Sequence, residues 1–149
     1  MKNHDQQIKE FFGEYAARFN RLIHHPSEED FRAVADSFTP CVIAANPAGV
    51  SCRENDAKLL ETIQQGFVFY RSIGTQSMNV TSLDITPLDD YHAMVKVFWN
   101  SRYLKQDNSE IQIDFDLIYL LSFTEKTPKI FAYIVGDEQQ VLREHGLLP

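Results

Sequence analysis

The stretch YHAMVKVFWNSRYLKQDNSEIQIDFDLIYLLSF, residues 91–123, decides the fold of this chain. Side chains of a β-strand alternate between its two faces, and both halves of the stretch show this alternation over a long distance. Segments 91–105 and 111–123 are therefore predicted to be strands joined by a turn at residues 107–109. One face of the pair is almost wholly apolar and should be concave. It carries Ala93, Val95, Val97, Trp99 and Tyr103, followed by Ile111, Ile113, Phe115, Leu117, Tyr119, Leu121 and Phe123.

The opposite face of these strands holds both acidic and apolar side chains. Asp114 and Asp116 are the obvious carboxylate pair, but they lie opposite the apolar face, so we expect them on the convex side without a catalytic role. If the two faces were reversed, they would be the first catalytic candidates. The convex face also carries four apolar residues, and such patches usually mark interfaces. We therefore predict a homodimer that uses Met94, Phe98, Ile118 and Leu120.

The remaining segments predict helices first and strands later. Apolar residues repeat at intervals of three and four over 5–24, 27–36 and 56–73, which is typical of helices with one buried face. A short strand at 40–45 and a loop at 46–54 separate the second helix from the third. Strand 75–86 changes phase near Thr81-Ser82, which predicts a β-bulge, and strand 130–135 precedes a short helix after Asp137.

This order predicts an α+β fold for residues 1–149 as a single domain. Three N-terminal helices should pack on the concave face of a strongly curved antiparallel sheet, with a short C-terminal helix after it. A net charge of −7 argues against nucleic acid and anionic membranes as partners. Residues 1–10 lack an apolar signal core, so we expect a cytoplasmic protein whose Cys41 and Cys52 are free thiols.

Metal and cofactor sites are not expected. Cys41 and Cys52 lack the close spacing of a zinc site. Neighbouring positions on a helix point about 100° apart, so His24 and His25 suit one metal ion poorly. The sequence also contains no glycine-rich phosphate loop. We therefore predict neither a bound metal nor a cofactor.

Several short pieces of the chain resemble the nuclear transport factor 2-like superfamily, which includes the SnoaL-like cyclases and ketosteroid isomerase. They are Tyr15–Asn20 (YAARFN), Asp30-Phe31, Phe38-Thr39-Pro40, Asn46–Gly49 (NPAG), Pro128-Lys129-Ile130, and the tail from Gly136-Asp137 to Pro149. Their order and spacing cover nearly the whole chain. The resemblance implies a cone-shaped, cystatin-like α+β barrel with a cavity at its mouth.

The resemblance also implies where to look for site residues. In ketosteroid isomerase an aspartate before the proline of the first strand moves a proton, and a helix-one tyrosine and a protonated aspartate bind the oxyanion. Here the positions carry Asn46, Tyr15 and Tyr119, respectively. An amide cannot act as a general base near neutral pH. The isomerase mechanism is therefore not expected intact.

We predict that one apolar cavity is bordered by Tyr15, Asn46, Trp99, Tyr103 and Tyr119. Their polar groups could orient a ligand carbonyl or hydroxyl. Alternatively, the tyrosines are core aromatics, and Asn46 only begins a turn, as Asn-Pro commonly does. The leading hypothesis is a protein that binds a small hydrophobic ligand. The alternatives are a lyase or isomerase of a hydrophobic cyclic substrate, which a carboxylate or histidine inside the cone would favour, and a protein-association module that uses the convex sheet face.

Overall fold

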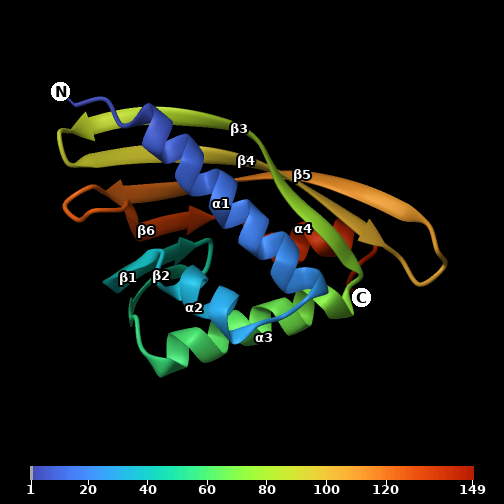
Figure 1. Cartoon of the computed structure of the whole chain (residues 1–149). Coiled ribbons are helices and arrows are strands. Elements are labelled where there is room, and N and C mark those ends of the chain that lie inside the picture. The colour runs from blue at the N-terminus through green and yellow to red at the C-terminus, as the bar shows by residue number, and fades with distance from the viewer. Residues whose placement is uncertain (1) are drawn as a thin grey trace.

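A six-stranded mixed sheet forms the centre of the computed structural model, which describes residues 2–149 (Figure 1). The strands lie in the order β2-β1-β6-β5-β4-β3. Every neighbouring pair is antiparallel except β1 and β6, which are parallel. Their bounds are β1 (Phe38–Asn46), β2 (Gly49–Glu54), β3 (Thr75–Asp89), β4 (His92–Leu104), β5 (Glu110–Ser122) and β6 (Lys129–Val135).

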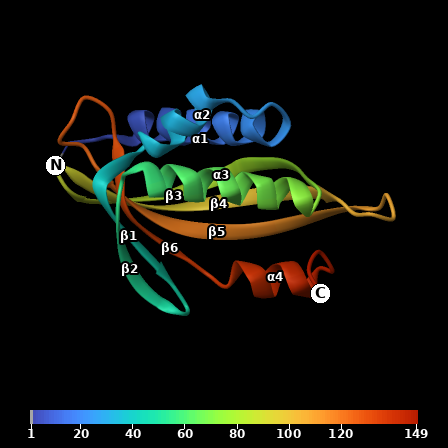
Figure 2. The same ribbon diagram turned by 90° about the horizontal axis from the view of Figure 1, so that it is seen from below.

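Four helices accompany this sheet in the described part of the chain: α1 (Asp5–His24), α2 (Glu28–Ala35), α3 (Ala57–Ser72) and α4 (Glu138–Glu144). α1 crosses the long strands (Figure 1), and a view from below shows α2 next to α1, with α3 alongside the strands (Figure 2). Three helices begin at side-chain caps: Ser27 Oγ accepts from the Asp30 N–H, Asp56 from the Lys58 N–H, and Asp137 from the Gln140 N–H. None of these helices is long and apolar enough to cross a membrane.

The core lies between α1 and the concave face of the sheet. Val95, Val97 and Trp99 of β4 are buried, as their alternation predicts, and they belong to the same cluster as Ile8 and Phe12 of α1. Fully burying one large apolar side chain contributes about 1.5–3 kcal/mol. This face therefore holds the helices against the sheet, and the predicted α+β architecture is confirmed.

The structure differs from the predicted fold in two details. Residues 49–54, expected within a loop, form β2 and pair with β1 as a hairpin. All six residues of β2 are exposed, so no buried face produced an apolar alternation in the sequence. The sheet is also mixed, because β1 returns beside β6 in parallel. The predicted bulge is confirmed: the register of β3 on β4 shifts between Val80 and Ser82.

Gly74 provides a test of the junction between α3 and β3. Its φ of 84° is rare for other residues, and a Cβ placed there would lie 2.0 Å from the Leu104 carbonyl oxygen. We expect Gly74→Ala to lower the free energy of unfolding by at least about 1–3 kcal/mol. Gly13→Ala is the matched control, because its Cβ would meet nothing within 4 Å. That helical change should stabilise the protein by about 1 kcal/mol. Urea denaturation measures both, and an unchanged midpoint for Gly74→Ala would contradict the described backbone.

Candidate functional site

A cavity of about 290 Å³ lies between the concave face of the sheet and the helices α1, α2, α3 and α4. Most of its lining is aromatic or aliphatic. The sheet contributes Phe38, Met78, Trp99, Tyr103, Ile113, Phe115, Asp116, Leu117, Tyr119, Tyr133 and Val135; the helices contribute Tyr15, Phe19, Val34, Ile63, Gly66, Phe67, Tyr70, Glu138, Val141 and Leu142; and Gly136 and Asp137 complete it. Apolar walls with a few polar groups are the usual composition of small-molecule sites.

Four of the five residues predicted for the cavity lie on its lining: Tyr15, Trp99, Tyr103 and Tyr119. Three of them form one aromatic cluster. The ring centroids of Tyr15 and Tyr119 are 6.2 Å apart, and those of Tyr15 and Trp99 are 6.3 Å apart. α1 supplies the first ring, while β4 and β5 supply the other two from the same face. The alternation of these strands is therefore what brings the three residues together.

Asn46 is not on the lining of this cavity. It is exposed at the end of β1, and its Oδ1 accepts a hydrogen bond of 2.8 Å from the Ala48 N–H. This local bond is typical of an asparagine that shapes a turn. The structure thus places Asn46 in the β1–β2 hairpin, as the alternative interpretation of the sequence expected.

The buried polar atoms of the cavity are mostly uncharged hydrogen-bonding groups. Burial raises the pKa of Tyr15, Tyr70, Tyr103 and Tyr119, so these phenols stay neutral at physiological pH. Trp99 is only 2% exposed, and its Nε1–H lies beside the Tyr119 hydroxyl without reaching hydrogen-bond geometry to any described group. A buried donor without a partner costs about 1–3 kcal/mol, which the packing around Trp99 must offset.

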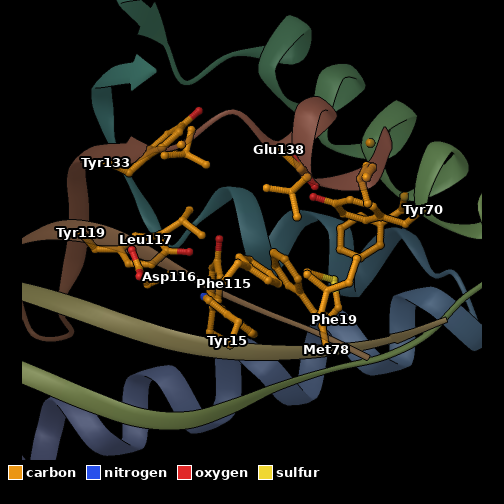
Figure 3. Close-up of a pocket in the computed structure, with 18 of the residues that line it drawn as sticks. Tyr15, Phe19, Tyr70, Met78, Phe115, Asp116, Leu117, Tyr119, Tyr133 and Glu138 are labelled. Atoms are coloured by element: carbon orange, nitrogen blue, oxygen red, sulfur yellow. The ribbon is translucent and has the colours of Figure 1, made fainter. Parts of the chain in front are cut away.

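Glu138 and Tyr70 lie together at one end of the cavity, whereas Asp116 lies near Tyr119. Figure 3 shows the Glu138 carboxylate and the Tyr70 hydroxyl directed toward one another at one end, with Tyr119 and Tyr133 at the other. Taken as a whole, the residue Glu138 is exposed to solvent. Its carboxylate lies on the lining of the cavity, where loss of surrounding water raises its pKa. The Tyr70 hydroxyl beside it offsets part of that rise in pKa. The pair combines a titratable carboxylate with a neutral phenol.

All charged residues on the lining of the cavity are acidic. Asp116, Asp137 and Glu138 border the cavity, and no Lys, Arg or His of the described residues does. Asp137 also caps α4, because its Oδ1 accepts from the Gln140 N–H at 3.0 Å. Asp116 is exposed, as predicted for the convex face, although it also borders the cavity. Its neighbour Asp114 is exposed and accepts a hydrogen bond from Asn100 Nδ2.

The convex face carries the four apolar residues predicted for a dimer interface, all half-buried in the single chain: Met94, Phe98, Ile118 and Leu120. The register pairs Met94 directly with Leu120. Ile118 is paired with Ile134 of β6, which is 48% exposed. The apolar surface therefore extends across three neighbouring strands.

Tyr70 and Glu138 were not among the site residues predicted from the sequence. Tyr70 belongs to the apolar stripe of α3, where an aromatic residue is typical of core packing. Glu138 looks like an ordinary acid in the first turn of a helix. Only the return of the chain after β6 brings α4 over the cavity. The one sequence signal for Tyr70 was its hydroxyl within an otherwise apolar stripe.

Comparison with protein families gives one match over most of the chain. The model of the family described as NTF2-like protein (DUF6841) matches residues 5–138. A search of curated proteins finds no match.

Solved structures agree with this chain over nearly its whole length. An NTF2-like protein with a cystatin-like fold from Novosphingobium aromaticivorans has a TM-score of 0.68 and 10% identity, covering 97% of this chain and 88% of its own. A ketosteroid isomerase-like protein from Erwinia carotovora atroseptica has a TM-score of 0.65 and 14% identity, with 91% and 97% covered. The β subunit of benzoate 1,2-dioxygenase from Burkholderia mallei has a TM-score of 0.63 and 18% identity, with 95% and 96% covered. At these identities the likeness establishes the fold alone.

Proposed function

Because the chain belongs to the NTF2-like family DUF6841, and because its cone encloses an apolar cavity, we propose that it binds a small hydrophobic ligand there. The observation that carries the proposal is the cavity of about 290 Å³ with mainly aromatic walls and a few buried polar groups. Burial of a ring ligand against such walls would supply most of the affinity. Tyr15, Tyr103 and Tyr119 would orient its polar atoms.

The aromatic rings on the lining favour a ligand that is a ring system over one that is a flexible chain. Trp99 and Phe115 have nearly parallel rings, with an interplanar angle of 8° and centroids 6.3 Å apart. Phe19 stacks on Trp99 from α1, with centroids 5.9 Å apart. Rigid aromatic walls favour rigid ligands, because neither partner then loses much conformational freedom on binding.

A lyase or isomerase is the second candidate function. The observation that favours it is a carboxylate at the cavity, because Glu138 can accept or donate a proton beside the Tyr70 hydroxyl. Asn46 offers no such base, and it lies in the hairpin turn. Loss of turnover in Glu138→Gln, with affinity for an uncharged apolar ligand retained, would distinguish an enzyme from a protein that only binds.

We also infer a homodimer that forms through the convex sheet face. The apolar residues of β4 and β5 on this face continue onto Ile134 of β6 and are left partly open in the single chain. A surface of this kind on a sheet is suited to a second copy of itself, since a twofold interface needs only one self-complementary patch. None of these apolar residues lies on the lining of the cavity, so the two proposals can be tested separately.

The ligand proposal predicts binding of 1-adamantanol, a rigid and non-fluorescent apolar probe. The chain has one tryptophan, so its emission should change when the probe enters beside Trp99. The melting temperature should also rise, because a ligand at a hundredfold its Kd stabilises the native state by about 2.7 kcal/mol. Gly66→Leu should abolish both effects, because its side chain would project from α3 into the cavity, where a Cβ meets nothing within 4 Å.

Two variants serve as controls for this experiment. Gly13→Leu makes the same substitution at an exposed position of α1 and should leave the affinity unchanged. Asn46→Ala should cost about 1 kcal/mol of stability through the lost turn bond and should also leave the affinity unchanged. Equal binding to wild type and Gly66→Leu would show that the probe binds outside the cavity.

The dimer proposal predicts that wild type sediments as a dimer at micromolar concentrations. Replacing Phe98 and Leu120 together by glutamate should give a folded monomer, since removing one central interface anchor commonly costs about 2 kcal/mol or more. Val68→Glu is the control, because Val68 is an apolar residue on α3, 59% exposed and away from the sheet face. Circular dichroism verifies folding of each variant. A monomeric wild type would end the dimer proposal.

A further inference from the structure

Resting on the proposed ligand binding, we propose that the cavity selects a hydrophobic ring ligand bearing a protonated amine, which Glu138 and Tyr70 bind at their end of the cavity. A ring ligand with a hydroxyl group in place of the amine would bind less tightly there, and a ring ligand with a carboxylate would not bind. The proposal assigns a ligand class and a recognition pair to the site. It follows from the position and sign of the charges on the lining.

The first step is the geometry of the recognition pair. The carboxylate of Glu138 and the hydroxyl of Tyr70 come from α4 and α3, and they face one another across one end of the cavity (Figure 3). A ligand ammonium placed between them can donate to the carboxylate and to the phenol oxygen. The walls next to this end are apolar: Val141 and Leu142 belong to the lining beside Glu138. A ring can therefore be buried while its amine stays paired.

The second step is the charge that the ligand would meet. Glu138 has three described tyrosines as electrostatic neighbours, Tyr70 of α3, Tyr103 of β4 and Tyr119 of β5, and all are neutral phenols. The other charges bordering the cavity are those of Asp116 and Asp137, which are also negative. No described lysine, arginine or histidine lines it, so an anionic ligand would have no partner. Charge pairs gain strength where water is displaced.

A second polar group, from β4, lies beside the cavity. The Trp99 Nε1–H, on the lining, has no hydrogen-bond partner among the described residues. A ligand acceptor would pair with this buried donor only after Trp99 or Tyr119 shifts, while the ligand amine pairs with Glu138. The two groups come from different elements, β4 and α4, so they constrain the ligand at separate points.

Three probes that share the adamantane hydrocarbon and differ in one polar group test the proposal: 1-adamantanamine, 1-adamantanol and 1-adamantanecarboxylate. Titration calorimetry and Trp99 emission should rank their affinities in that order at neutral pH. The amine should bind about tenfold to a hundredfold more tightly than the alcohol, as expected for a hydrogen bond to a charged group. Glu138→Gln should remove this preference. Glu144→Gln, a control on the same helix with the same charge change, should preserve it.

The pH dependence gives an independent readout. The amine preference requires ionised Glu138, so it should be complete above the pKa of that carboxyl and disappear as the pH falls through it. Because loss of water raises this pKa, the preference should disappear at a higher pH than an ordinary glutamate would give. Adamantanol affinity should not follow this profile. Tight adamantanol binding without an amine preference overturns this inference alone, whereas failure of all three probes counts against the proposed ligand site itself.

The β1–β2 hairpin carries a second, independent site. Cys41 and Cys52 are both exposed, and their Sγ atoms lie 3.1 Å apart. The register pairs Ile43 with Cys52 and Cys41 with Glu54, so the two cysteines are diagonal neighbours on one face of the hairpin. The geometry points to a dithiol that is oxidised to an intramolecular disulfide by a small disulfide such as oxidised glutathione.

The reaction consists of two balanced exchange steps. One cysteine loses its proton to solvent, and its thiolate attacks a glutathione sulfur, which forms a mixed disulfide and releases one glutathione thiolate. The second cysteine thiolate then attacks the protein sulfur of that mixed disulfide and releases the second glutathione. The two cysteines lose two electrons in total, and one oxidised glutathione gains them.

Intact-protein mass spectrometry after treatment with oxidised glutathione tests this site. Wild type should lose two hydrogens and retain no glutathione, because the neighbouring thiol resolves the mixed disulfide. Cys41→Ser and Cys52→Ser should each retain one glutathione. Stable glutathione adducts on wild type would overturn the inference, as would unreacted thiols in wild type when both single variants react.

Discussion

The contact between α1 and the apolar face of β4 and β5 is the constraint on which the rest of the structure depends. Phe12 and Tyr15 are buried in this contact, and Tyr119 packs against both, with a centroid distance of 5.1 Å to Phe12. A curved sheet without this helix would expose its largest apolar surface to water. α1 covers only part of the concave face, so α3 and α4 enclose what remains. The cavity is therefore the space left between helices that must cover a curved sheet.

The polar groups of the cavity have positions that follow from this arrangement. The tyrosines of α1 and β5 reach inward because the apolar stripe and the strand alternation direct them there. Glu138 reaches the same cavity from α4, where it is the first residue of a helix with an exposed face. A carboxylate is tolerated there because it lies at an end of the cavity, next to the Tyr70 hydroxyl, and not in the apolar centre.

Sequence patterns predicted the elements with a buried face, and they failed where burial was absent. The alternation of β4 placed Trp99 and Tyr103 on the concave side, and the phase change in β3 located its bulge. β2 was missed because all its residues are exposed. The role of Glu138 could not be predicted, because its approach to Tyr70 depends on how the chain turns after β6. Asn46 was placed at the cavity by resemblance, but a local hydrogen bond to Ala48 holds it in a turn.

The parallel pairing of β1 with β6 has a consequence for the order of folding. Ala45 pairs with Ile134, so this contact joins segments that are far apart in the sequence. Long-range pairing of this kind carries a high entropic cost of loop closure and slows folding. During synthesis β1 can pair with β2 early, but it cannot join the rest of the sheet until residues 129–135 have left the ribosome. α4 follows directly after β6, so the wall that carries Glu138 is synthesised only after every strand of the sheet.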